Sequence, residues 1–227
     1  MFKFLERGRR EALVLIPGWA FDYRIFDTLD LPYNYIFFCG DSVLGFEDSL
    51  KEALRKNNIG RVSFFGWSQG AFLASDFAAK NPDIVDEVIL VSIRKKYNGE
   101  VLENIKRYLG KNRKSFLYKF YRDCFCEAEA ERSAWFRKRF LKYYLHNTQL
   151  QGLVGNLDWL SRARIRPEPL KELRKIKIIH GRKDRIAPVE EAQEIKNSLP
   201  RARLIIFEDT GHLPFLRRDF SESLYRE

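Results

Sequence analysis

The sequence predicts an α/β protein, with a mostly parallel sheet flanked by helices and a helical cap inserted after the sixth strand. Short apolar runs rich in β-forming residues alternate with helical patterns over most of the 227 residues. The alternation stops between Lys95 and Arg166, where the pattern is helical throughout. We therefore expect one domain, with an α/β core formed by residues 1–94 and 167–227 and a cap formed by residues 95–166.

Six runs have the composition of strands. The run Ala12–Ile16 is apolar at every position, which is typical of a strand buried on both faces of a parallel sheet. The strand that ends near Ile93 is taken as the sixth strand of the fold, after which the cap begins. The predicted strands are Ala12–Ile16, Tyr35–Cys39, Val62–Phe65, Val88–Ile93, Ile176–His180 and Leu204–Phe207.

Helical spacing of apolar residues fills most of the intervals between these strands. Pro82 and Pro200 each end a predicted helix, because the residue before a proline disfavours helical geometry. In the cap, apolar residues recur at helical spacing, as in Phe136 and Phe140. The predicted core helices are Phe46–Asn57, Ala71–Lys80, Val189–Leu199 and Asp219–Arg226.

Ser68 lies in the segment Gly66-Trp67-Ser68-Gln69-Gly70, between a predicted strand and a predicted helix. This is the strand–turn–helix context of a G-x-S-x-G nucleophile elbow. Such a tight turn strains the backbone at the serine and crowds its neighbours, so glycine is favoured two positions to either side. The helix that follows would point its positive N-terminus at the oxygen that becomes negative. The motif predicts a serine hydrolase with Ser68 as nucleophile.

A serine hydroxyl needs a base to take its proton, and the base needs an acid to orient it. Asp184 and His212 each follow a predicted strand, in the chain order Ser, Asp, His. The carboxyl ends of parallel strands meet at one edge of a sheet, so we expect the three residues to meet there. The predicted catalytic triad is Ser68, His212 and Asp184. We expect His180 to be a core histidine with satisfied hydrogen bonds and His146 to lie on the surface.

An oxyanion hole should be formed by two backbone N–H groups. The residue after the nucleophile, Gln69, supplies one of them. The other is expected from Trp19, in the loop Pro17–Phe21 that follows the strand Ala12–Ile16. For the Trp19 side chain, plain core packing is the alternative interpretation.

Charge and cysteine content limit the partners and the compartment. The net charge is +10, and residues 95–166 carry 17 Lys and Arg against 7 Asp and Glu, whereas the rest of the chain has 24 of each. The cap therefore holds the whole excess, which suggests either an acidic partner or an ordinary solvated helix surface. With three cysteines, no signal peptide and no apolar run of about 18 residues, we expect a cytoplasmic protein.

The ordered motifs resemble those of the α/β-hydrolase superfamily over most of the chain. Within it, they are most similar to the family of pimeloyl-[acyl-carrier protein] methyl ester carboxylesterases of biotin synthesis. Many relatives have His where this chain has Pro17, which removes a side chain that braces the loop but leaves the N–H donor. The motifs are Pro17-Gly18-Trp19, Gly66-Trp67-Ser68-Gln69-Gly70, Gly155-Asn156-Leu157-Asp158-Trp159-Leu160 and Gly211-His212-Leu213-Pro214-Phe215.

This resemblance implies a serine carboxylesterase that removes a methyl ester from a pimeloyl chain through an acyl-enzyme, without a metal or another cofactor. It implies substrate contacts by Trp19, Trp67 and Phe120; for Phe120, a place in the core of the cap is the alternative. It also implies that an acidic acyl-carrier protein docks on the basic cap. The densest basic cluster, and the docking site we select, is Arg137, Lys138, Arg139 and Lys142.

Two other functions fit part of the sequence. A general carboxylesterase or a thioesterase for small or acyl esters would use the same triad. A nucleic-acid-binding module would use the interleaved arginines and aromatics of the cap but would leave the triad unexplained. We therefore expect neither nucleic acid nor a membrane as a partner.

Overall fold

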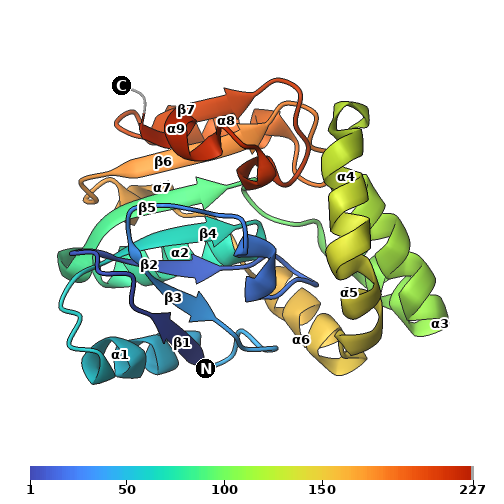
Figure 1. Cartoon of the computed structure of the whole chain (residues 1–227), viewed down its shortest axis with the longest axis horizontal. Helices are drawn as coiled ribbons and strands as arrows, with labels where there is room; N and C mark the ends of the chain where they lie inside the picture. Colours follow the sequence, from blue (N-terminus) through green and yellow to red (C-terminus); the bar gives the residue numbers. More distant parts are fainter. Residues whose placement is uncertain (226–227) are drawn as a thin grey trace.

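The computed structural model describes residues 1–225 and contains a seven-stranded sheet with the strand order β1-β3-β2-β4-β5-β6-β7 (Figure 1). β1 is antiparallel to β3, and every other neighbouring pair is parallel, so the predicted mostly parallel sheet is confirmed. The strands are β1 (Phe2–Leu5), β2 (Ala12–Ile16), β3 (Asn34–Phe38), β4 (Val62–Trp67), β5 (Val85–Val91), β6 (Ile176–Gly181) and β7 (Arg203–Phe207).

All six predicted strands are present with small shifts at their ends, and β1 is an addition. β1 alternates between half-buried and exposed residues at the edge of the sheet, so it lacks the continuous apolar run of the inner strands. The helical segment of residues 95–166 follows β5, the fifth strand in chain order, and not the sixth.

The four predicted core helices are also present. They are α1 (Phe46–Lys56), α2 (Gln69–Lys80), α8 (Val189–Ser198) and α9 (Phe220–Tyr225), and a short helix α7 (Pro167–Leu170) precedes β6. The predicted end of the last helix, at Arg226, lies outside the described residues. Within residues 1–225, no helix is both long and apolar enough to span a membrane.

Between β5 and α7 the structure is helical, and these helices gather beyond the carboxyl ends of the strands (Figure 1). Lys96 and Arg164 form an isolated antiparallel bridge, so the two ends of this segment lie side by side. The long helix α3 has a kink at Asn112, whose φ and ψ of −157° and 87° are not helical. The helical elements are α3 (Gly99–Asp123), η3 (Glu127–Glu129), α4 (Ala130–Phe136), the π-helical turn η4 (Arg137–Leu141), α5 (Lys142–Asn147) and α6 (Leu150–Leu160).

An aromatic cluster packs these helices against the α/β core. Phe21, in the loop after β2, lies with its ring centroid 5.0 Å from that of Tyr121 on α3 and 5.3 Å from that of Tyr144 on α5. The Tyr121 hydroxyl donates to the Ala20 carbonyl at 2.7 Å. Tyr121 is almost completely buried, and burial of a large apolar side chain contributes about 1.5–3 kcal/mol. The helices are therefore packed onto the loop that borders the predicted oxyanion hole.

Candidate active site

Ser68 stands at a strained turn between β4 and α2. Its φ and ψ are 54° and −112°, and its N–H donates to the Val91 carbonyl at 2.8 Å. A Cβ on Gly66 would lie 2.4 Å from the Gly70 carbonyl oxygen, and a Cβ on Gly70 would lie 2.2 Å from the Ile16 carbonyl oxygen. Both glycines are therefore required by close backbone approach, as expected of a nucleophile elbow.

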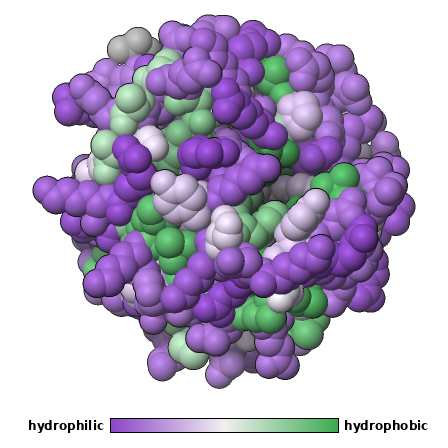
Figure 2. Space-filling view, turned by 90° about the vertical axis from the view of Figure 1, so that its right-hand side faces the viewer, coloured by the Kyte–Doolittle hydropathy of each residue, from purple (hydrophilic) through white to green (hydrophobic). Residues whose placement is uncertain are grey.

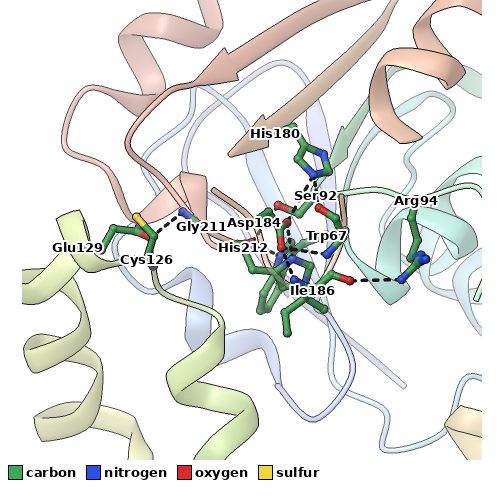
Figure 3. A network of polar contacts seen from close by, with 11 residues as sticks. Trp67, Ser92, Arg94, Cys126, Glu129, His180, Asp184, Ile186, Gly211 and His212 are labelled. Atoms are coloured by element: carbon green, nitrogen blue, oxygen red, sulfur yellow. Dashed lines mark hydrogen bonds and ion pairs between the residues drawn. The ribbon is translucent and has the colours of Figure 1, made fainter. Parts of the chain in front are cut away.

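Asp184 and His212 form a buried hydrogen-bonded pair (Figure 3). The His212 Nδ1 donates to Asp184 Oδ2 at 2.7 Å, which leaves Nε2 as the nitrogen that can take a proton. Asp184 Oδ1 accepts from the backbone N–H groups of Ile186 and Ala187 at 2.8 and 2.9 Å. Burial alone would raise the pKa of Asp184, but the His212 imidazole and its hydrogen bond outweigh burial and lower it. The carboxylate is thus held in its charged form next to the imidazole.

The backbone of His212 is held from two sides. Its carbonyl accepts from Trp67 Nε1 at 2.8 Å and from Ser92 Oγ at 2.9 Å, and its N–H donates to the Cys124 carbonyl at 2.8 Å. Trp67 has no exposed surface. The structure therefore does not support the predicted contact of Trp67 with a substrate, because its side chain packs in the core and supports the His212 loop.

His180 lies behind the Asp184–His212 pair. Its Nε2 donates to the Ala187 carbonyl at 2.8 Å and lies 3.5 Å from Asp184 Oδ2. Within the described part of the chain its Nδ1 has no hydrogen-bond partner, so the prediction of a fully satisfied core histidine holds for one nitrogen only. Burial lowers the pKa of His180, which keeps this ring neutral.

The predicted oxyanion-hole residues border Ser68. A Cβ on Gly18 would lie 3.2 Å from Ser68 Cβ, so the loop after β2 packs directly against the elbow. The Trp19 N–H has no hydrogen-bond acceptor among residues 1–225. Gln69 is the first residue of α2, where an N–H lacks an intrahelical partner. Both backbone N–H groups therefore lack an acceptor among the described residues.

A small cavity of about 90 Å³ opens next to this loop. Gly18 and Gln69 contribute to its wall, together with residues of the β3–α1 loop, α5 and α6. The Gln69 Nε2 is buried without a partner in the described residues. Trp19 and Phe120 are not in the wall of this cavity; their rings pack against each other with centroids 5.1 Å apart, and Phe120 is half-buried.

The predicted basic cluster lies on the outer surface of η4 and α5. Arg137, Lys138, Arg139 and Lys142 are all exposed. Arg139 forms an ion pair with Asp27 of the core, whereas the other three have no ion pair within residues 1–225. The face of the molecule that carries these helices is mainly hydrophilic, with apolar residues in its recessed middle (Figure 2).

Two residues near the site were not predicted from the sequence. Tyr97 is half-buried, and burial raises the pKa of its hydroxyl while the nearby Ser68 opposes that shift. Glu129 carries a fully buried carboxylate that accepts from the N–H of Gly211, next to His212. The position of Tyr97, shortly after β5 at the carboxyl edge of the sheet, is a signal that could have identified it.

Within the described residues, no group of three or more His, Cys, Asp or Glu lies close enough to hold a metal ion.

Residues 17–219 match the family described as alpha/beta hydrolase fold. The chain belongs to this family. It is 27% identical to the pimeloyl-[acyl-carrier protein] methyl ester esterase of Nitrosomonas europaea, over 92% of this chain and 91% of the relative. It is 25% identical to the esterase of the same name from Legionella pneumophila, over 93% and 91% of the two chains.

Solved structures show the same fold. An esterase from Exiguobacterium antarcticum superposes with a TM-score of 0.82 at 20% identity, covering 98% of this chain and 93% of the other. The enol-lactonase from Burkholderia xenovorans superposes with a TM-score of 0.83 at 16% identity, covering 99% and 93%. At these identities the likeness establishes the fold alone.

Proposed function

We propose that this carboxylic ester hydrolase removes the methyl ester from a pimeloyl group carried by an acyl-carrier protein, a reaction of biotin synthesis. The observation that carries the proposal is the buried Asp184–His212 hydrogen bond, together with the hydrogen bond from Trp67, in the strained Ser68 elbow, to the His212 carbonyl. The names of the relatives described above support the choice of substrate, and the basic helices support the choice of carrier.

The proposed reaction has two steps. His212 Nε2 takes the proton of the Ser68 hydroxyl while its oxygen attacks the ester carbonyl, and the resulting oxyanion accepts from the N–H groups of Trp19 and Gln69. Methanol then leaves with the proton from His212, which gives an acyl-enzyme. Water, deprotonated by His212, attacks this acyl-enzyme and releases the free carboxylate of the substrate. Asp184 orients the imidazole and stabilises its charged form throughout.

We propose that residues 95–166 act as a cap that receives the carrier. The bridge between Lys96 and Arg164, at the two ends of this segment, supports its description as an insertion. Exposed cations on η4 and α5 would pair with carrier carboxylates and with the phosphate of its prosthetic arm. Of the predicted docking residues, Arg137, Lys138 and Lys142 are the better candidates, because Arg139 already pairs with Asp27.

Substrate contacts by Trp19 and Phe120 belong to the same proposal. Both are aromatic, and they face each other between the core loop and α3, where an acyl chain could insert between cap and core. The three cysteines are unpaired, which supports a reducing cytoplasm as the proposed location.

The test compares pimeloyl-carrier methyl ester with free monomethyl pimelate. We expect a higher kcat/KM for the carrier substrate, a loss of that advantage at high salt, and little effect of salt on the free ester, because exposed charge pairs are screened. A Ser68→Ala variant should be inactive on both. Equal efficiency on the two substrates at low salt would refute carrier recognition and favour a general carboxylesterase. Full activity of Ser68→Ala would refute the triad.

A further inference from the structure

Glu129 is a buried carboxylate where the cap meets the His212 loop (Figure 3). Its side chain has no exposed surface. Oε2 accepts from the Gly211 N–H at 2.6 Å and from the Cys126 N–H at 2.9 Å. Oε1 accepts from Arg132 Nε at 3.1 Å. Both oxygens are thus used, and one of them joins the cap to the residue before His212.

Helix capping accounts for only part of this arrangement. Glu129 ends η3 and returns to the Cys126 N–H in a capping box, a role that glutamine also fills in proteins. The Gly211 N–H, however, belongs to a loop 82 residues further along the chain. Burial of a carboxylate costs several kcal/mol unless the charge is well paired. The start of η3 therefore does not by itself explain why a buried carboxylate contacts this loop.

Gly211 fits closely against the cap. A Cβ at this position would lie 2.6 Å from the Cys124 carbonyl oxygen and 2.9 Å from Glu129 Oε2, so only glycine allows the contact. The next N–H, that of His212, donates to the same Cys124 carbonyl at 2.8 Å. Two consecutive backbone amides are therefore held by acceptors of the cap.

Together with the contacts from the core, these hydrogen bonds hold both the backbone and the ring of His212. Trp67 and Ser92 of the core hold its carbonyl, and Asp184 holds its ring. The cap holds its N–H and the peptide before it. If the cap contacts were lost, the backbone of His212 would be anchored from the core side alone, and the imidazole could shift relative to Ser68.

We propose that Glu129 is a positioning residue for His212. Proton transfer at Ser68 then requires the cap to be packed against the His212 loop through the hydrogen bond between this carboxylate and the Gly211 N–H. The inference rests on the proposed triad. A misplacement of about 1 Å in a reacting group can cost roughly 100-fold in rate. Glu129→Ala removes both acceptors, and we expect kcat on a p-nitrophenyl ester to fall by about 10- to 100-fold, with KM changed less than about two-fold.

The isosteric variant Glu129→Gln tests the same idea without a cavity. It keeps one neutral acceptor but places an amide against Arg132, and we expect a kcat loss of about 10-fold. The matched control is Glu127→Gln, in the same turn, whose exposed carboxylate pairs with Arg185 at 3.5 Å. This control should keep wild-type kcat. Thermal melts of each variant measure its stability separately from its activity.

A double variant separates positioning from general damage. If Glu129 acts through His212, then Glu129→Gln should cost nothing further in a His212→Ala background, where the base is already absent. In the wild-type protein, the Gly211 amide proton should also exchange slowly with solvent, which hydrogen-exchange NMR measures even if the alanine variant does not fold.

Three results would overturn the proposal: a kcat of Glu129→Gln within two-fold of wild type, an equal loss in the His212→Ala background, or fast exchange of the Gly211 amide. An active His212→Ala variant would instead refute the triad. The two failures are therefore distinguishable in one set of proteins.

Discussion

Gly70→Ala should damage both stability and catalysis, because the added methyl group has no room. The Cβ would lie 2.2 Å from the Ile16 carbonyl oxygen and 2.7 Å from its carbonyl carbon, and ordinary contacts begin at about 3.4 Å. Ile16 is the last residue of the buried strand β2, so neither partner can move without displacing the sheet or the elbow. The gap must widen from 2.2 Å to about 3.4 Å.

This displacement of the elbow from β2 sets the expected losses of stability and of kcat in Gly70→Ala. Overpacking in a core typically costs about 1–3 kcal/mol, and the rigid backbone partner places this variant at about 3 kcal/mol. A shift of roughly 1 Å between the elbow and the oxyanion loop corresponds to about a 100-fold loss of kcat. Urea denaturation measures the first value, and hydrolysis of a p-nitrophenyl ester measures the second.

Gly110→Ala is the matched control for this variant. Gly110 lies within α3, and a Cβ there meets no atom within 4 Å. Alanine should stabilise the helix by about 0.5–1 kcal/mol and leave kcat unchanged. A Gly70→Ala protein with wild-type stability and kcat would refute the reasoning that the elbow glycine is required by the approach of β2.

Two further predictions concern the acid side of the site. Asp184→Asn should fold but lose about 10⁴-fold in kcat, because an amide no longer selects the required His212 tautomer; a loss below about 10-fold in the ester assay would contradict the role of the acid. His180 has a pKa below its ordinary value of 6.5, so the unfolded chain binds more protons than the folded one. Its contribution to stability is complete above pH 6.5 and is lost as the pH falls below it. Denaturant titrations at pH 7.5 and 5.5 should therefore show wild-type destabilisation in acid that is smaller in His180→Gln, and an equal acid effect in both proteins would refute the assignment.

The sheet and the three triad candidates could be predicted because their signals are local. Each of Ser68, Asp184 and His212 lies in the loop or turn that follows a strand, and parallel strands bring such positions to one edge. β1 was missed because an edge strand needs only one apolar face. These features depend on a few neighbouring residues, which one sequence is enough to reveal.

The roles of Trp67 and Glu129 could not be predicted in the same way. Trp67 is next to the nucleophile in sequence, but its indole crosses the core to a carbonyl 145 residues away. The residues around Glu129 predict only that it caps a helix start. Its hydrogen bond to Gly211 forms only when residues 95–166 pack on the α/β core. Contacts of such sequence separation leave no periodic or motif signal.

The bridge between Lys96 and Arg164 also bears on how this protein could be re-engineered. Because Lys96 and Arg164, at the two ends of residues 95–166, lie side by side, a segment of another length could close the same gap at little extra entropic cost. A transplanted segment would nevertheless have to present two acceptors to the amides of Gly211 and His212. Without them, each buried N–H would cost about 1–3 kcal/mol. The length of a transplanted segment is therefore a weaker limit on such a change of specificity. The stronger limit is the short part of the segment that must accept from the Gly211 and His212 amides.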